Sequence, residues 1–132
     1  MSGSARILVA DNDEDILTLV AFRLERLGHE VLVARDGQEA LDRAQAELPD
    51  LCVLDVMMPR LTGYDVTEQL RAGAQTASIP VILLTARVQE ADVQRGLAAG
   101  ADAYVRKPFS PAELREQVEA LLERGARAPG AG

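Results

Sequence analysis

Five short apolar segments recur along the chain at intervals of roughly 20 to 30 residues, and this spacing constrains the fold more than any other feature. Each segment is too short to form a helix, and three of them lack the alternating polar residues of a half-exposed strand. They are residues 7–10, 31–34, 51–54, 81–84 and 103–105. Continuous apolar runs of this length are typical of strands that helices cover on both faces. The sequence therefore favours a sheet buried in the middle of the molecule.

The segments between these runs carry helical patterns. In the clearest one, the apolar residues share one face of a helix that ends at Gly28, a residue suited to the left-handed conformation that follows many helices. These apolar residues are Ile16, Val20, Leu24 and Leu27.

The start of the last helix is also marked. Ser110 can cap it, Pro111 suits its first position, and Glu113 can close a capping box. Three further helices are predicted near residues 38–47, 64–71 and 90–98, with Gly100 as a stop after the third.

Strands that alternate with helices pair in parallel through right-handed crossovers, which predicts a three-layer, doubly wound α/β domain with five strands and five helices. A chain of 132 residues suits one such domain. We assign the domain to residues 5–124. Residues 1–4 are expected to be disordered, and residues 125–132 to form a flexible tail or a shortened linker.

Composition excludes several classes of function. A formal net charge of -7 disfavours direct nucleic-acid binding, because a protein that grips phosphates needs a positive face. The chain contains no signal-peptide pattern and no apolar stretch of about 18 residues, so we expect a cytoplasmic protein with no membrane contact. The single cysteine, Cys52, lies within an apolar run and is predicted to be a buried, inert thiol.

Polar residues follow four of the five predicted strands. Asp11, Asn12 and Asp13 follow the first, Asp55 follows the third, Thr85 ends the fourth, and Lys107 follows the fifth. In open parallel sheets, ligands bind beyond the carboxyl ends of the strands. Carboxylates, a hydroxyl group and a cation are therefore expected to converge on one edge of the sheet.

Some of these residues also have a purely structural interpretation. Asp13 can cap the first helix, and Thr85 can simply end a strand. Asp55 is harder to explain in this way, because an ionised group after four apolar residues is costly to bury unless it is paired or bound to a metal. Lys107 is the only lysine beside thirteen arginines, which indicates that a compact cation is needed at this position.

Taken together, the motifs resemble the receiver domains of two-component response regulators, the chemotaxis-type receiver family, over Ile7 to Leu122. The motifs that carry the resemblance are Ile7-Leu8-Val9-Ala10-Asp11-Asn12-Asp13, Leu54-Asp55-Val56-Met57-Met58-Pro59 with Gly63, Leu84-Thr85-Ala86, Gly100-Ala101-Asp102-Ala103-Tyr104 and Lys107-Pro108-Phe109. The resemblance implies a flavodoxin-like fold with strand order 2-1-3-4-5.

The resemblance also implies a chemistry. Asp55 would accept a phosphoryl group from a sensor histidine kinase or a phosphotransfer protein, and Lys107 would pair with that group. Mg²⁺, or Mn²⁺, would be held by Asp11, Asp55 and the backbone carbonyl of Met57, together with Asn12. The protein would act as a switch and not as an enzyme, with at most magnesium-dependent self-phosphorylation from small donors and autodephosphorylation.

The same resemblance implies how the switch works. Thr85 would move toward the phosphoryl group, and Tyr104 would turn inward to fill the space that it leaves. The face formed by the helix near 90–98, the strand 103–105 and the last helix would change shape for an output partner that no motif identifies. The Lys107–Pro108 peptide bond is expected to be cis.

Two positions depart from the family pattern. Asn12 stands where most receivers have a second acidic ligand, so we expect weaker Mg²⁺ binding, unless Asp13 supplies the missing charge. On the output face, Val93, Ala103 and Gln117 replace several charged residues through which many receivers dimerise, and Glu113 remains without its expected cationic partner. We therefore do not expect that mode of dimerisation.

Two other functions remain open at this stage. A haloacid-dehalogenase-type phosphatase would use Asp11 as its nucleophile, but it would leave Asp55 unexplained and would place Asp15 where that family prefers Thr or Val. A phosphorylation-independent binding module would keep the fold without the chemistry, and Asn12 favours this to some extent. His29, the only histidine, precedes the second strand and is predicted to be a surface residue.

Overall fold

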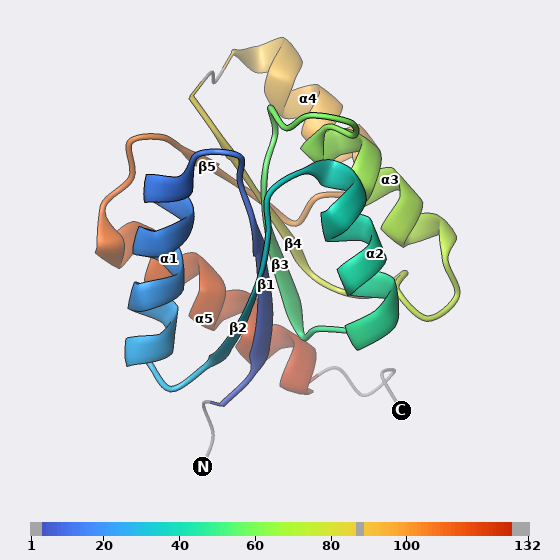
Figure 1. The fold of residues 1–132 in the computed structure, drawn as a ribbon. Coiled ribbons are helices and arrows are strands. Elements are labelled where there is room, and N and C mark those ends of the chain that lie inside the picture. Colours follow the sequence, from blue (N-terminus) through green and yellow to red (C-terminus); the bar gives the residue numbers. More distant parts are fainter. Residues whose placement is uncertain (1–3, 87–88, 128–132) are drawn as a thin grey trace.

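A computed structural model describes residues 4–86 and 89–127, in which five strands alternate with five helices (Figure 1). The elements are β1 (Arg6–Ala10), α1 (Glu14–Arg26), β2 (Glu30–Ala34), α2 (Gly37–Glu47), β3 (Leu51–Asp55), α3 (Gly63–Ala72), β4 (Val81–Thr85), α4 (Glu90–Ala99), β5 (Ala103–Arg106) and α5 (Pro111–Arg127). All strand pairs are parallel, and the strand order is β2-β1-β3-β4-β5. The predicted flavodoxin-like order is therefore confirmed.

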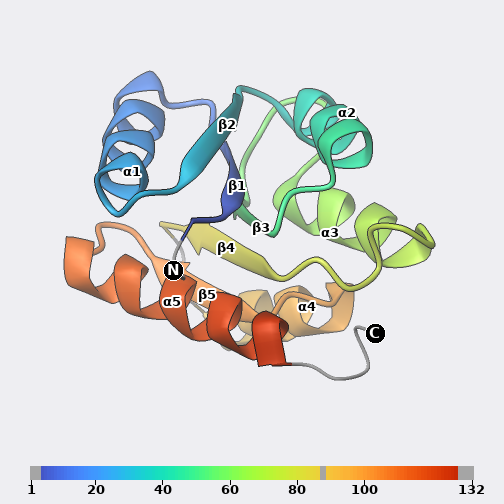
Figure 2. The same ribbon diagram turned by 90° about the horizontal axis from the view of Figure 1, so that it is seen from below.

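The sheet lies between two layers of helices, with α1 and α5 on one face and α2, α3 and α4 on the other (Figures 1 and 2). Successive residues of β1 and β3 point to opposite layers. Ile7 and Val9 pack toward α1 and α5, whereas Leu8 and Ala10 pack toward α2 and α3. Because both faces are buried, the central strands need no polar alternation, which explains the continuous apolar runs in the sequence.

The helices begin and end close to the predicted residues, with one difference in the buried face of α1. Leu17, Val20 and Leu24 are buried, whereas Leu27 is 36% exposed. The apolar pattern predicts Leu27 on the buried face, but this residue follows the helix as its C-terminal cap and is not part of that face. Gly28 adopts the predicted left-handed conformation with φ of 96°.

The prediction for His29 is wrong, and the prediction for Cys52 is confirmed. His29 is only 8% exposed, and its Nδ1 accepts a hydrogen bond from the backbone N–H of Ala5 at 3.1 Å. The imidazole ties the start of β1 to the turn before β2, a contact that the polarity of the residue alone did not indicate. Cys52 is fully buried in β3, and burial raises the pKa of its thiol to about 12.

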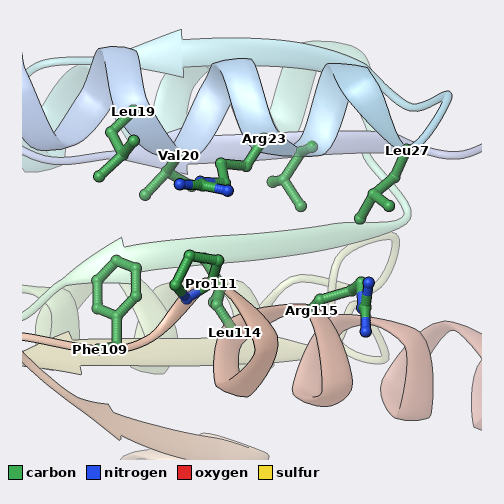
Figure 3. A pocket seen from close by; sticks show the side chains of 9 residues that line it. Leu19, Val20, Arg23, Leu27, Phe109, Pro111, Leu114 and Arg115 are labelled. Atoms are coloured by element: carbon green, nitrogen blue, oxygen red, sulfur yellow. The ribbon is translucent and has the colours of Figure 1, made fainter.

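A groove runs along the surface between α1 and α5 (Figure 3). Exposed apolar side chains lie along it, including Leu19 of α1 and Leu27 directly after this helix, and Phe109 and Pro111 border it from the α5 side. None of the residues that line this groove belongs to the polar cluster at the strand ends described below. Among the described residues, no helix is long and apolar enough to cross a membrane.

The predicted disordered start and flexible tail fall largely on residues 1–3 and 128–132, which lie outside the described residues.

Candidate functional site

The strand order brings together residues that are far apart in the sequence. β1 and β3 are neighbours, with Ala10 opposite Leu54, so Asp11 and Asp55 occupy equivalent positions at the carboxyl ends of two paired strands. Helices leave β1 and β3 toward opposite faces of the sheet, which opens a crevice at this point in doubly wound folds. Both aspartates are nonetheless shielded from solvent, since Asp11 is fully buried and Asp55 is 4% exposed.

Lys107 extends from the end of β5 into this crevice. Its Nζ lies 2.9 Å from Asp11 Oδ2 and 3.1 Å from Asp55 Oδ1. Its backbone N–H donates to the Thr85 carbonyl at 2.7 Å, which anchors the residue beside β4. The Lys107–Pro108 peptide bond is cis, as predicted.

Two carboxylates share one ammonium group, which leaves the site short of positive charge. Burial raises the pKa of Asp55, the negative charge of Asp11 raises it further, and hydrogen bonds from Lys107 and from the Met57 backbone offset part of the rise. Burial by itself would lower the pKa of Lys107, but its bonds to Asp11 and Asp55 outweigh burial and raise it. The site is therefore prepared to accept additional positive charge.

Asn12 lies against the same carboxylate. In the orientation that satisfies its amide, the nitrogen donates to Asp55 Oδ2 at 3.3 Å and to the Met57 carbonyl oxygen at 3.2 Å. Asp13 is oriented differently, because its carboxylate caps α1 by accepting from the backbone N–H groups of Asp15 and Ile16. The idea that Asp13 supplies the missing acidic ligand is therefore wrong, and the structural role considered for it is the one observed.

These donors fit a hard divalent cation. The carboxylates of Asp11 and Asp55, the Met57 carbonyl and the Asn12 amide oxygen are all oxygen ligands of the kind that Mg²⁺ prefers. The amide of Asn12 contacts both Asp55 and Met57, and Asp11 shares the Lys107 ammonium group with Asp55, so these potential ligands belong to one cluster. This site has only two carboxylates, since position 12 carries an amide. Among the described residues, no group of three or more His, Cys, Asp or Glu side chains is placed to hold a metal ion.

The loop after β3 is fixed by tight backbone packing at Gly63. A Cβ atom at this position would lie 2.6 Å from the backbone oxygen of Asp55 and 3.0 Å from Cα of Val56. Thr62 and Asp65 form a capping box in which each side chain accepts from the backbone of the other. These contacts hold the segment that contains Met57 against the end of β3.

Thr85 and Tyr104 lie beside the carboxylate cluster, on β4 and β5. Thr85 is 3% exposed, and its side chain shares a hydrogen bond with Tyr104. The Tyr104 hydroxyl also lies 3.0 Å from that of Tyr64 in α3. No motif in the sequence singles out Tyr64, and its contact with Tyr104 depends on how α3 packs beside α4.

Comparison with known proteins agrees with this geometry. The profile of the Response regulator receiver domain family matches residues 7–119. The chain is 50% identical over 119 residues to the alkaline phosphatase synthesis transcriptional regulatory protein PhoP of Bacillus subtilis, a match that covers 90% of this chain and 49% of that protein.

Solved receiver domains have the same fold. The receiver domain of the Francisella response regulator 1452 superposes with a TM-score of 0.84 at 38% identity, over 91% of this chain and 98% of the other. The receiver domain of sensor histidine kinase PA1611 from Pseudomonas aeruginosa, solved with a magnesium ion coordinated in its active site cleft, gives 0.85 at 30% identity over the same shares.

The chain therefore belongs to the response regulator receiver domain family, whose members act as signalling switches in two-component systems. It spans about half the length of the curated relatives it matches. The comparisons give no support to the phosphatase or to the phosphorylation-independent module.

Proposed function

We propose that Asp55 is the residue that accepts the phosphoryl group in this receiver domain. The observation that carries the proposal is the position of Lys107, whose ammonium group bridges Asp11 and Asp55 at distances of 2.9 and 3.1 Å. The two carboxylates differ in exposure, because Asp11 is fully buried whereas Asp55 is 4% exposed. Asp55, the last residue of the central strand β3, is therefore the better placed nucleophile.

The reaction is a transfer between two nucleophiles. A carboxylate oxygen of Asp55 forms a bond to phosphorus, the bond from phosphorus to the donor breaks, and its electron pair stays on the donor. For a phosphohistidine of a sensor kinase or a phosphotransfer protein, the donor atom is an imidazole nitrogen. Catalysis of phosphoryl transfer depends mainly on positioning and on neutralising charge on the phosphoryl oxygens. Lys107 supplies one such charge from its position beside Asp55.

Mg²⁺ or Mn²⁺ would be held by Asp11, Asp55 and the carbonyl of Met57, with the Asn12 amide turned so that its oxygen faces the ion. When bound, the ion neutralises charge on the transferred group. The same arrangement would support, at most, magnesium-dependent self-phosphorylation from small donors and autodephosphorylation. We place this phosphoryl transfer in the cytoplasm. A kinase or phosphotransfer protein is the donor, and an effector that no motif identifies is the output partner.

The added phosphoryl group carries about -1.5 to -2 charges, which attract nearby hydroxyl donors. The hydroxyl of Thr85, at the end of the strand next to β3, is the candidate donor to a phosphoryl oxygen. A turn of Thr85 toward Asp55 would alter its bond to Tyr104 and so change the face formed by α4, β5 and α5. An unidentified effector would recognise that face.

A phosphoryl mimic tests this function. Beryllofluoride, added with Mg²⁺, should give bound ¹⁹F signals with the wild type and none with Asp55→Asn. Arg60→Lys is the matched control, because Arg60 lies in the loop that follows Asp55 but is exposed to solvent, and it should bind as the wild type does. Absence of bound signals in the wild type would overturn the proposal and favour a phosphorylation-independent binding module.

A further inference from the structure

The hydroxyl groups of two tyrosines meet where α3, α4 and β5 come together. Tyr64 Oη in α3 lies 3.0 Å from Tyr104 Oη in β5 and 3.4 Å from the backbone carbonyl oxygen of Asp92 in α4. Tyr104 also shares a side-chain hydrogen bond with Thr85 at the end of β4. One set of hydrogen bonds therefore joins the strand beside Asp55 to the helix on the opposite side of Tyr104.

The number of hydroxyl protons determines which group donates and which accepts in each of these hydrogen bonds. A phenol has one proton to donate, and a backbone carbonyl can only accept. Tyr64 therefore donates to the Asp92 carbonyl, Tyr104 donates to Tyr64, and Thr85 donates to Tyr104. The shift in the pKa of Tyr104 agrees with this order: burial raises it, the bond to Tyr64 raises it further, and the bond with Thr85 lowers it.

Packing holds both rings in place. Tyr64 is 7% exposed, and the guanidinium carbon of Arg95 lies 4.7 Å from the centre of its ring. Tyr104 packs directly against α4 at Gly96, where a Cβ atom would lie 2.9 Å from the ring. The packing of the two rings against α4 therefore keeps their hydroxyl groups close together. Because this packing involves the rings, we expect it to remain when one hydroxyl group is removed.

We propose that Tyr64 is a positioning residue, which holds the Tyr104 hydroxyl and transmits the state of the Thr85 hydroxyl to the backbone of α4 at Asp92. Chains of hydrogen bonds polarise one another, so a change at the first donor is felt at the last acceptor. If Thr85 turns away from Tyr104, the bond between Tyr104 and Tyr64 weakens and the Asp92 carbonyl is released in turn. The link to phosphorylation rests on the proposed function, but the relay itself does not.

The relay can be tested without any phosphoryl group. The amide of Val93 shares a peptide bond with the Asp92 carbonyl, so its NMR signal reports on the end of the relay. Thr85→Val removes the first donor, and we expect it to shift the Val93 signal in the wild-type background. In the Tyr64→Phe background the same change should leave Val93 almost unmoved.

The chain offers internal controls for this experiment. It has two tyrosines and no tryptophan, so ¹³C-labelled tyrosine gives one ring signal for each member of the pair. The Tyr104 signal should still respond to Thr85→Val in Tyr64→Phe, because the first link remains. Thr67→Val removes another buried hydroxyl of α3, which donates to Gly63 O at 2.8 Å, and should leave the Val93 response intact.

The outcomes separate the relay from the proposed function. An unchanged Val93 response in Tyr64→Phe, or no response to Thr85→Val in the wild type, would overturn the relay. Beryllofluoride with Mg²⁺ provides the second arm, in which bound ¹⁹F signals should appear in both the wild type and Tyr64→Phe, with the Val93 shift largely lost in the variant. Missing ¹⁹F signals would contradict the role of Asp55 and leave the relay standing on the first arm.

Discussion

The ammonium nitrogen of Lys107 lies 3.1 Å from Oδ1 of Asp55, although 52 residues separate them in the sequence. The only lysine of the chain thus meets the carboxylate that ends the central strand. Because Asp11 shares the same ammonium group, the pair is short of one positive charge. This imbalance determines how the site should respond to pH, to substitution and to a divalent cation.

The imbalance predicts that Asp55→Asn stabilises the protein at neutral pH. The folded-state pKa of Asp55 is raised above its unfolded value, so its favourable contribution is complete at low pH and is lost as the pH rises through the folded pKa. In the absence of Mg²⁺, the variant should be more stable than the wild type by about 1 kcal/mol at pH 7. Urea unfolding at several pH values measures this, and the difference should vanish below about pH 4. A wild type that is the more stable protein at pH 7 would contradict the charge argument.

Asn12→Asp should change stability in opposite directions with and without Mg²⁺. A third carboxylate adds repulsion to the empty cluster, so the free energy of unfolding should fall in EDTA by about 1 kcal/mol. With Mg²⁺ the new ligand should tighten binding by about tenfold. At the same saturating Mg²⁺ concentration, ion binding should then add about 1.4 kcal/mol more to the free energy of unfolding than it adds in the wild type. Asp13→Asn is the matched control, because Asn is an equally good cap for α1. Equal Mg²⁺ affinity in the wild type and Asn12→Asp, by calorimetric titration, would refute the prediction.

Lys107→Arg should slow phosphoryl uptake although the charge is kept. A planar guanidinium is larger than an ammonium group and cannot occupy the same point between two carboxylates. The Lys107 side chain is only 15% exposed, so there is little room for the larger group to adjust. We expect a loss of about tenfold or more in the rate of labelling from a small phosphodonor. Arg106→Lys, the reverse exchange at the exposed neighbouring residue, should label at the wild-type rate, and equal rates for both variants would count against a specific role for Lys107.

Gly63→Ala should destabilise the loop that carries Met57. The new Cβ would lie 2.6 Å from the backbone oxygen of Asp55, and backbone atoms cannot move aside as flexible side chains do. We expect a loss of about 2 kcal/mol or more in the free energy of unfolding, together with weaker Mg²⁺ binding because the Met57 carbonyl shifts. Thermal unfolding with and without Mg²⁺ checks both effects. A variant with wild-type stability would show that this close approach is not needed.

The fold and the carboxylate cluster could be predicted because both depend on local patterns. Continuous apolar runs mark strands that are buried on both faces, and the carboxyl ends of parallel strands must lie at one edge. Asp11, Asp55 and Lys107 each follow such a run directly, so their convergence required no knowledge of side-chain packing.

Other features depend on packing between distant elements and were not predictable in this way. The contact between Tyr64 and Tyr104 requires α3 and β5 to meet beside α4, which no spacing in the sequence encodes. The burial of His29 depends on a hydrogen bond to the backbone of Ala5, outside its own segment. Asp13 was ambiguous, because the same carboxylate suits a helix cap and a metal ligand, and only the structure shows which N–H groups it meets.

The most direct test of the central claim is to locate the phosphoryl group itself. The protein is incubated with acetyl phosphate and Mg²⁺, the acyl phosphate is reduced with borohydride, and the modified residue is identified by peptide mass spectrometry. The account predicts one modified residue, Asp55, with labelling abolished in Asp55→Asn and only slowed in Asp11→Asn. Modification of Asp11, or undiminished labelling of Asp55→Asn, would contradict it.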